Sequence, residues 1–208
     1  MKILICDDHK IICEGLRRIL QQLSGVTLIK EVGCAEDVFS LLDNIVFDII
    51  LLDISLPDKS GLDIIEPIKA KYSSTNILML SIHREEQYAI RSFKLGASGY
   101  LTKNCSSEEL LMAIKKIYNG GKYISQSIAE NIALHLDNGF SKMKHEILSN
   151  REYEIMLKLV KGMSLVEIAE ELLISNKTVS TYRSRIMEKM GFSKNTELAR
   201  YCIENNLA

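Results

Sequence analysis

Five polar residues of types that often do chemistry stand where short apolar runs of the sequence end: Asp7, Asp8, Asp53, Ser81 and Lys103. If they converge, the three carboxylates repel one another, by about 4 kcal/mol for a pair ~4 Å apart at an effective dielectric constant near 20. A cation would remove that repulsion, and oxygen ligands favour Mg²⁺ or Mn²⁺. Asp8 and Asp53, with the backbone carbonyl of Ser55 and water, would leave coordination positions for a phosphoryl group, and Lys103 would add a fixed positive charge beside it.

These residues meet only if the apolar runs are parallel strands of one sheet. The runs, at residues 3–6, 27–32, 48–52, 77–80 and 99–101, alternate with helical patterns at 11–23, 35–44, 61–71, 85–95 and 110–118. This alternation predicts a doubly wound α/β domain with a five-stranded parallel sheet between two layers of helices. The carboxyl ends of such strands share one edge of the sheet, where ligands bind.

The last 60 residues contain helical patterns and no strand pattern. Ser149 with Glu152, and Ser164 with Glu167, form Ser-x-x-Glu capping boxes, and Ser175 or Asn176 can cap a third helix. A short turn at 174–176 separates a helical pattern at 165–173 from another at 177–190. Helix, tight turn and helix are the layout of a helix-turn-helix, so we expect a small all-helical domain.

The helix at 177–190 has one apolar and one polar face. At about 100° per residue, Val179, Ile186 and Met190 fall on one side. The opposite side carries small polar and charged groups, with Arg185 at its flank: Lys177, Ser180, Thr181, Ser184 and Glu188. Residues 176–194 hold five Lys or Arg against one Glu, a net charge of +4, whereas 145–208 hold nine of each sign. A local basic strip of this kind is suited to DNA phosphates.

The composition is that of an ordinary globular protein. The 208 residues are 47% hydrophobic and 25% charged, and 26 Lys and Arg against 27 Asp and Glu leave a net charge of −1. These values argue against disordered, collagen-like and histone-like classes. Because no apolar run approaches the ~20 residues that span a bilayer, we expect a soluble, cytoplasmic protein without a membrane partner. The five widely spaced cysteines have no zinc-site spacing, and we expect them to be reduced.

The first 123 residues resemble the receiver domain of two-component response regulators. The motifs that carry the resemblance are Asp7-Asp8, Asp53, Leu56-Pro57-x-x-x-Gly61, Ser81, Tyr100 and Lys103. The resemblance implies that Asp53 accepts a phosphoryl group from a partner histidine kinase. It also implies that Mg²⁺ is held by Asp7, Asp8, Asp53 and the Ser55 carbonyl, that Ser81 and Lys103 grip the phosphate, and that Ser81 and Tyr100 form a switch.

Residues from about 148 resemble the LuxR-type helix-turn-helix of the NarL/FixJ regulators. The matching motifs are Leu148-Ser-x-Arg151-Glu152, Gly162-x-Ser164, Glu167-Ile168-Ala169, Leu173-x-Ser175-x-Lys177-Thr178-Val179 and Lys189-Met190-Gly191. The resemblance implies that Ser180, Thr181 and Ser184 read bases in the major groove. Phosphates would be held by Lys177, Thr178, Arg183 and Arg185. Ser180 and Tyr182 depart from the family's frequent Lys and His, which weakens any transfer of a known operator sequence.

Together these features predict three segments: a phosphoacceptor receiver domain at 1–123, a linker with a helix at 124–147, and a DNA-binding domain at 148–208. The linker helix would bury Ile128, Ile132, Ala133 and Leu136, and would end at Asp137-Asn138-Gly139. We expect a DNA-binding transcription regulator that is phosphorylated on Asp53 and binds double-stranded DNA as a homodimer. We do not expect an enzyme, beyond self-phosphorylation from a phosphodonor and hydrolysis of its own aspartyl phosphate.

Other interpretations remain open at this point. Asp7 alone could cap a helix, Lys103 could be a solvated loop residue, and Tyr100 could be an ordinary core residue. His9 follows the acidic pair, but a site already supplied with oxygen atoms has little need of it. The helix at 177–190 could be an amphipathic helix with a solvated face. The protein could also act mainly by pairing with another protein factor.

Overall fold

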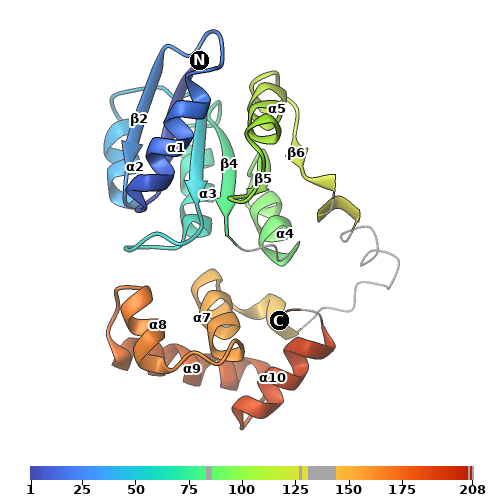
Figure 1. Ribbon diagram of the computed structural model, residues 1–208. Coiled ribbons are helices and arrows are strands. Elements are labelled where there is room, and N and C mark those ends of the chain that lie inside the picture. The colour runs from blue at the N-terminus through green and yellow to red at the C-terminus, as the bar shows by residue number, and fades with distance from the viewer. Residues whose placement is uncertain (83–85, 127, 131–143, 206, 208) are drawn as a thin grey trace. The chain divides into compact units, whose positions relative to one another are not determined.

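The computed structural model describes residues 1–82, 86–126, 128–130, 144–205 and 207. The chain divides into two compact units, Met1–Asn138 and Gly139–Ala208 (Figure 1). The first is a parallel α/β unit and the second is helical, which confirms the predicted fold class. No described helix is long and apolar enough to cross a membrane.

The sheet of the first unit has strands β1 (Lys2–Cys6), β2 (Leu28–Val32), β3 (Ile49–Asp53), β4 (Asn76–Ser81), β5 (Gly99–Thr102) and β6 (Tyr123–Ile124). All pairings are parallel, in the order β2-β1-β3-β4-β5-β6. The sequence predicted the first five strands and missed the sixth, so the expected count of five is corrected to six. A two-residue strand is too short to show a periodic pattern.

Strand β6 pairs with β5 at Gly99, where the chain is closely packed. A Cβ atom at Gly99 would stand 3.0 Å from the Tyr123 carbonyl oxygen and 2.7 Å from the Ile117 side chain. Tyr123 N–H also donates to the carbonyl of Ser98 (3.0 Å). The start of the predicted linker is therefore part of the receiver sheet.

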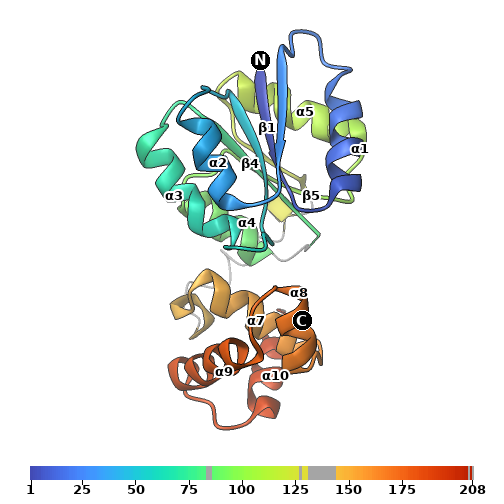
Figure 2. The same cartoon turned by 90° about the vertical axis from the view of Figure 1, so that its left-hand side faces the viewer.

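Among the described residues, the helices that cover the sheet are α1 (Lys10–Leu20), α2 (Ala35–Leu42), α3 (Gly61–Lys71), α4 (Glu86–Lys94) and α5 (Ser107–Tyr118). Helices α1 and α5 lie on one side of it, and α2 and α3 lie on the other (Figure 2). On the first side, Ile3 and Leu51 of the sheet are buried against Leu16 of α1 and Ile114 of α5. Strands covered on both faces explain the nearly continuous apolar runs of the sequence.

In the part of the second unit that the structure describes, a short 3-10 helix η1 (Lys144–Ile147) precedes the α-helices α7 (Asn150–Val160), α8 (Leu165–Glu171), α9 (Asn176–Met190) and α10 (Asn195–Glu204). Both predicted capping boxes are present. Ser149 Oγ accepts from Glu152 N–H (3.3 Å) while the Glu152 carboxylate accepts from Ser149 N–H (2.8 Å), and the Ser164 box is alike. Ser175 caps α9 by accepting from Thr178 N–H (3.1 Å).

The predicted linker lies largely outside the described residues. Residues 128–130 are helical, but Ile132, Ala133, Leu136 and the Asp137-Asn138-Gly139 turn are not described. The boundary between the two compact units also falls there. The expected segment limits at 123 and 148 therefore stay predictions. All five cysteines are free thiols.

Candidate functional site

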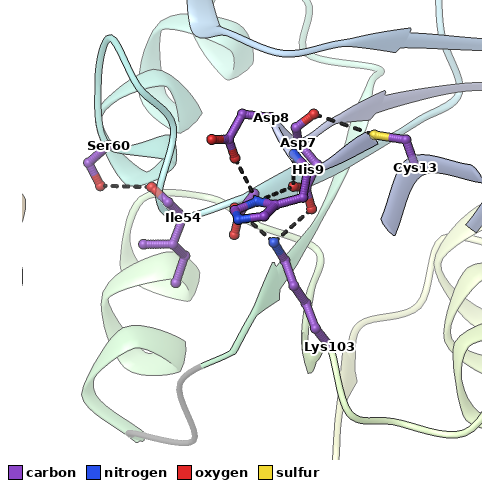
Figure 3. Close-up of polar contacts among 8 residues, drawn as sticks. Asp7, Asp8, His9, Cys13, Ile54, Ser60 and Lys103 are labelled. Atoms are coloured by element: carbon purple, nitrogen blue, oxygen red, sulfur yellow. Dashed lines mark hydrogen bonds and ion pairs between the residues drawn. The ribbon is translucent and has the colours of Figure 1, made fainter. Parts of the chain in front are cut away.

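The carboxyl edge of the sheet gathers two buried carboxylates around one lysine. Asp7 directly follows β1, Asp53 ends β3, and Lys103 follows β5. Lys103 Nζ lies 2.7 Å from Asp7 Oδ2 and 2.8 Å from Asp53 Oδ2. The three side chains are only 2%, 4% and 7% exposed, for Asp7, Asp53 and Lys103 respectively. Figure 3 shows the Lys103 side chain reaching the acidic residues from below. Parallel strands bring together residues that are up to 96 positions apart in the sequence.

The electrostatics of the site follow from this burial. Burial raises the pKa of Asp53 to about 6, and the charge of Asp7 adds to the rise, although Lys103 opposes it. Burial by itself would lower the pKa of Lys103, but the charges of Asp53 and Asp7 and their hydrogen bonds outweigh it, so that pKa is raised. Lys103 therefore stays an ammonium group, and one positive charge is shared by two carboxylates.

Asp8 and His9 complete the cluster at its outer side. His9 Nδ1 lies 2.8 Å from Asp8 Oδ1 and 3.1 Å from Asp7 Oδ1, as the dashed lines of Figure 3 show. One ligand-capable atom from each of Asp7, Asp8, His9 and Asp53 lies within 4.8 Å of the others. The structure thus brings the three predicted carboxylates together, and it adds His9, for which the sequence offered little reason. Three carboxylates with ligand atoms this close together are an oxygen-rich donor set that fits a hard divalent cation.

The loop after β3 holds Ser55 beside Asp53. Gly61 N–H donates to the Ile54 carbonyl (2.7 Å), and Ser55 pairs with Ser60 across the base of the loop. A Cβ atom at Gly61 would stand 1.9 Å from the Asp53 carbonyl oxygen, so only glycine fits there. The Leu-Pro-x-x-x-Gly motif therefore has a steric basis: its glycine lets helix α3 begin against the strand that carries Asp53.

The two predicted switch residues lie inside the sheet. Ser81 ends β4 and is buried, and its carbonyl accepts from Lys103 N–H (2.7 Å). Tyr100 is fully buried in β5, opposite Met79 of β4. Ser81 is thus tied through the backbone to the lysine of the site, whereas Tyr100 occupies a core position.

In the second unit, the predicted DNA-contacting residues lie on α9. Lys177, Ser180, Thr181, Ser184 and Arg185 are exposed, while Thr178 and Arg183 are half-buried. Val179, Ile186 and Met190 are buried, as the helical projection predicted. Ser175, Thr178, Thr181 and Arg185 are among the residues that line a shallow depression at the start of the helix.

Two cations of the basic strip are engaged within the unit. Arg183 Nε donates to Asn195 Oδ1 of α10 (3.0 Å). Lys189 Nζ lies 2.6 Å from the carboxylate of the buried Glu152 on α7. The Lys189–Glu152 ion pair offsets one of the positive charges counted over 176–194, so that count overstates the charge that α9 presents outward. Lys177 and Arg185 remain exposed, near the start and middle of the helix.

Sequence reasoning named Arg151 only as part of the Leu148-Ser-x-Arg151-Glu152 motif and did not predict that it holds the turn before α9. The buried Arg151 of α7 contacts Glu154 (2.8 Å) and donates to the Leu172 carbonyl at the end of α8 (3.2 Å). The turn that follows has Leu173 at a φ of 50°. The Arg151-Glu154 spacing of three residues was the available signal, although it gives no hint of the carbonyl 21 residues away.

A doubly wound sheet with a lysine-bridged carboxylate pair at its carboxyl edge, joined to a helix-turn-helix, defines a class of signalling proteins: regulators with a phosphoacceptor domain and a DNA-binding domain in one chain.

Comparisons with known proteins agree with this class. Residues 3–115 match the response regulator receiver domain, and residues 146–202 match the bacterial regulatory proteins of the luxR family. Response regulator UvrY of Escherichia coli K12 is 33% identical over 208 residues, which cover 100% of this chain and 95% of UvrY. The chain therefore belongs to the response regulators of the NarL/FixJ family, with a receiver domain and a LuxR-type DNA-binding domain.

Two solved structures are similar to this chain, one over part of its length and one over nearly all of it. A LuxR-family two-component response regulator from Aurantimonas sp. SI85-9A1 is 32% identical, with a TM-score of 0.62, and the match covers 64% of this chain and 96% of that one. A structure of two RcsB dimers bound to two parallel DNAs is 25% identical, with a TM-score of 0.61, over 97% of this chain and 96% of that one. Receiver domains bind Mg²⁺ at an acidic pocket, and this chain has such an aspartate cluster.

Proposed function

We propose that this response regulator controls transcription through phosphorylation of Asp53 by a partner histidine kinase. The observation that carries the proposal is the lysine bridge: Lys103 Nζ lies within 2.8 Å of both Asp7 and Asp53 at a buried edge. An ammonium group held there can contact the carboxylate of Asp53 before the transfer and the oxygens of the incoming phosphoryl group after it. Phosphoryl transfer needs mainly this kind of positioning and charge neutralisation.

In the proposed reaction, a carboxylate oxygen of Asp53 attacks the phosphorus of a phosphohistidine on the kinase. The new O–P bond forms as the P–N bond breaks, and the histidine nitrogen keeps the electron pair. Asp7, Asp8, Asp53 and the carbonyl of Ser55 would hold Mg²⁺, which neutralises charge on the phosphoryl oxygens. We propose no external substrate: turnover is limited to self-phosphorylation from a phosphodonor and hydrolysis of the aspartyl phosphate.

The proposed switch runs from Asp53 to Ser81 and Tyr100. A phosphoryl group adds negative charge and acceptor oxygens, towards which the Ser81 hydroxyl can turn. Ser81 lies on β4, and its carbonyl accepts a hydrogen bond from Lys103 N–H. A shift of either residue would therefore displace the other. Tyr100, in the next strand, would then move into the space that Ser81 leaves.

The proposed output is sequence-specific binding of double-stranded DNA by a homodimer. Ser180, Thr181 and Ser184 are exposed on one helix and suit base contacts, while Lys177, Thr178, Arg183 and Arg185 suit phosphates. The RcsB structure contains dimers bound to DNA, which supports the same arrangement for this chain. A regulator that meets both a kinase and the chromosome would work in the bacterial cytoplasm.

The test is a selection of genomic DNA fragments by the full-length protein, with and without beryllofluoride and Mg²⁺ as a mimic of the aspartyl phosphate. We expect a two-fold or tandem motif to be enriched with the mimic. The same motif in both samples would reduce Asp53 to a modulator. Absence of any motif in both samples would contradict the proposal and favour action through pairing with another protein.

A second measurement tests the acceptor residue itself. Incubation with a radioactive phosphodonor should give acid-labile labelling of the wild-type protein and none of Asp53→Asn, because an amide oxygen is a poor nucleophile. Persistent acid-labile labelling of Asp53→Asn would refute the assignment of Asp53.

A further inference from the structure

The side chain of Asp58 caps a helix from a different part of the chain. Its Oδ1 accepts from Ala35 N–H (3.0 Å) and its Oδ2 accepts from Glu36 N–H (3.1 Å), at the start of α2. The N-cap of this helix is Cys34. Its side chain accepts no capping hydrogen bond from the described residues. Asp58, 22 or more residues away, therefore supplies the acceptors for the first two N–H groups of the helix.

Asp58 belongs to the loop that presents Ser55. The base of this loop is closed by Gly61 N–H to Ile54 and by the pairing of Ser55 with Ser60. Asp58 stands at the tip, beyond that closure. Its two hydrogen bonds tie the tip to α2, so the loop is held both at its base and at its tip.

The segment that leads into α2 lies against the backbone of Asp7 and Asp8. Asp7 N–H donates to the Val32 carbonyl (3.0 Å), and Cys6 Sγ donates to the Cys34 carbonyl (3.8 Å). A Cβ atom at Gly33 would lie 3.8 Å from Cα of Asp8. Residues 32–34 thus follow the backbone that carries Asp7 and Asp8.

We propose that Asp58 is a positioning residue that joins the loop carrying Ser55 to the segment at 32–34. By tying the Ser55 loop to the segment beside Asp7 and Asp8, it sets the separation between the Ser55 carbonyl and these carboxylates. It thereby sets the affinity of the pocket for Mg²⁺ without touching the ion. The inference rests on the proposed function, in which these groups hold the cation. Residues that orient metal ligands in this way change metal affinity when they are replaced.

The experiment is a calorimetric titration of the full-length protein with Mg²⁺. Asp58→Ala should weaken Mg²⁺ binding about tenfold, the lower end of the range for residues that support metal ligands. Asp58→Asn keeps one acceptor oxygen and should lose less. Glu36→Gln is the matched control, because it removes a carboxylate from the first turn of the same helix and leaves the tie intact; its Mg²⁺ affinity should stay within about twofold of wild type.

A double variant separates positioning from mere stabilisation of α2. Cys34→Ser places a capping hydroxyl at the N-cap itself, so Asp58→Ala with Cys34→Ser should recover the thermal stability that Asp58→Ala loses. The tie to the Ser55 loop is still missing, so Mg²⁺ affinity should stay low. Recovery of both properties would overturn the proposal and leave Asp58 as a helix cap.

Two further outcomes have distinct meanings. If wild type binds Mg²⁺ and Asp58→Ala binds it equally well, the positioning role is wrong while the proposed function stands. If wild type itself takes up no Mg²⁺, the proposed metal site fails and the role of Asp58 fails with it. Should Asp58→Ala not fold, equal affinities of Asp58→Asn and wild type would also count against the proposal.

Discussion

At the scale of single residues, the proposed acceptor carboxylate, Asp53, is placed at an energetic disadvantage. Asp53 is buried beside a second carboxylate, and one lysine serves both. Because the pKa of Asp53 rises to about 6, its ionised form is less favourable in the folded protein than in the unfolded chain. The site therefore favours whatever adds positive charge or removes negative charge.

This predicts an unusual pH dependence of stability. Between the ordinary pKa of 3.8 and about 6, the folded protein holds more protons on Asp53 than the unfolded chain does, so the Asp53 contribution lowers stability as the pH rises through this window. Asp53→Asn removes that penalty, and Lys103 keeps its contact with Asp7. We expect Asp53→Asn to raise the free energy of unfolding at pH 7.5 without Mg²⁺ by on the order of 3 kcal/mol or less.

Urea denaturation at pH 7.5 and pH 4 checks this expectation. The gain from Asp53→Asn should be largest at pH 7.5, should shrink towards pH 4, and should narrow when Mg²⁺ stabilises the wild type. A loss of stability at pH 7.5 would mean that Lys103 stabilises ionised Asp53 by more than burial costs it.

At the scale of elements, the start of α3 fixes the geometry of the site. Gly61 begins this helix against the carbonyl of Asp53, where a Cβ atom would stand 1.9 Å away. The clash involves backbone on both sides, so it cannot be relieved by a side-chain rotation. Helix α3 and strand β3 must separate if any other residue is placed there.

Gly61→Ala should therefore destabilise the receiver domain by about 1–3 kcal/mol, the usual range for overpacking, and should impair phosphorylation of Asp53. Gly15→Ala in α1 is the control, since nothing lies within 4 Å of a Cβ atom there and alanine favours a helix. Thermal denaturation and phosphoryl uptake are the measurements. If Gly61→Ala has the thermal stability and phosphoryl uptake of the wild type, the backbone near Asp53 can accommodate a Cβ atom and this expectation is wrong.

The turn before α9 gives the second prediction at this scale. Leu173 has a φ of 50°, a conformation that favours glycine, and its side chain is 70% exposed. Replacement by glycine should stabilise the DNA-binding domain by about 1 kcal/mol, because it relieves the strain and little packing is lost. Leu173→Ala keeps the backbone strain and should give no such gain. Equal effects of both variants in thermal denaturation would point to the exposed side chain rather than the backbone.

At the scale of the whole molecule, the proposed phosphate contacts and base contacts of α9 should affect DNA binding in different ways. Lys177→Ala removes an exposed cation, so it should weaken binding to all sequences and lower the slope of log affinity against log salt by about 1. Thr181→Ala should leave that slope unchanged and relax the preference for one base pair. Affinities at several salt concentrations, combined with a sequence selection, distinguish the two. An unchanged selection profile for Thr181→Ala would remove it from the base-reading set.

Much of this architecture could be predicted because it depends on the local periodicity of apolar and polar residues. Apolar runs gave the first five strands, the Ser-x-x-Glu spacing gave the starts of α7 and α8, and the 100° projection separated Val179, Ile186 and Met190 from the exposed face of α9. The convergence of Asp7, Asp53 and Lys103 also followed, since parallel strands share a carboxyl edge. Motif order then identified the family.

The tertiary structure alone decided the features that depend on contacts between distant segments. Lys189 pairs with Glu152 across 37 residues, Asp58 caps α2 from the β3 loop, and the two residues of β6 pair with β5. Such pairings leave no trace in the periodicity of either partner. The sequence by itself determined which residues could do chemistry and on which elements they stand; the packing of those elements decided which side chains hold them in place, because side-chain contacts form between segments that only the folded chain brings together.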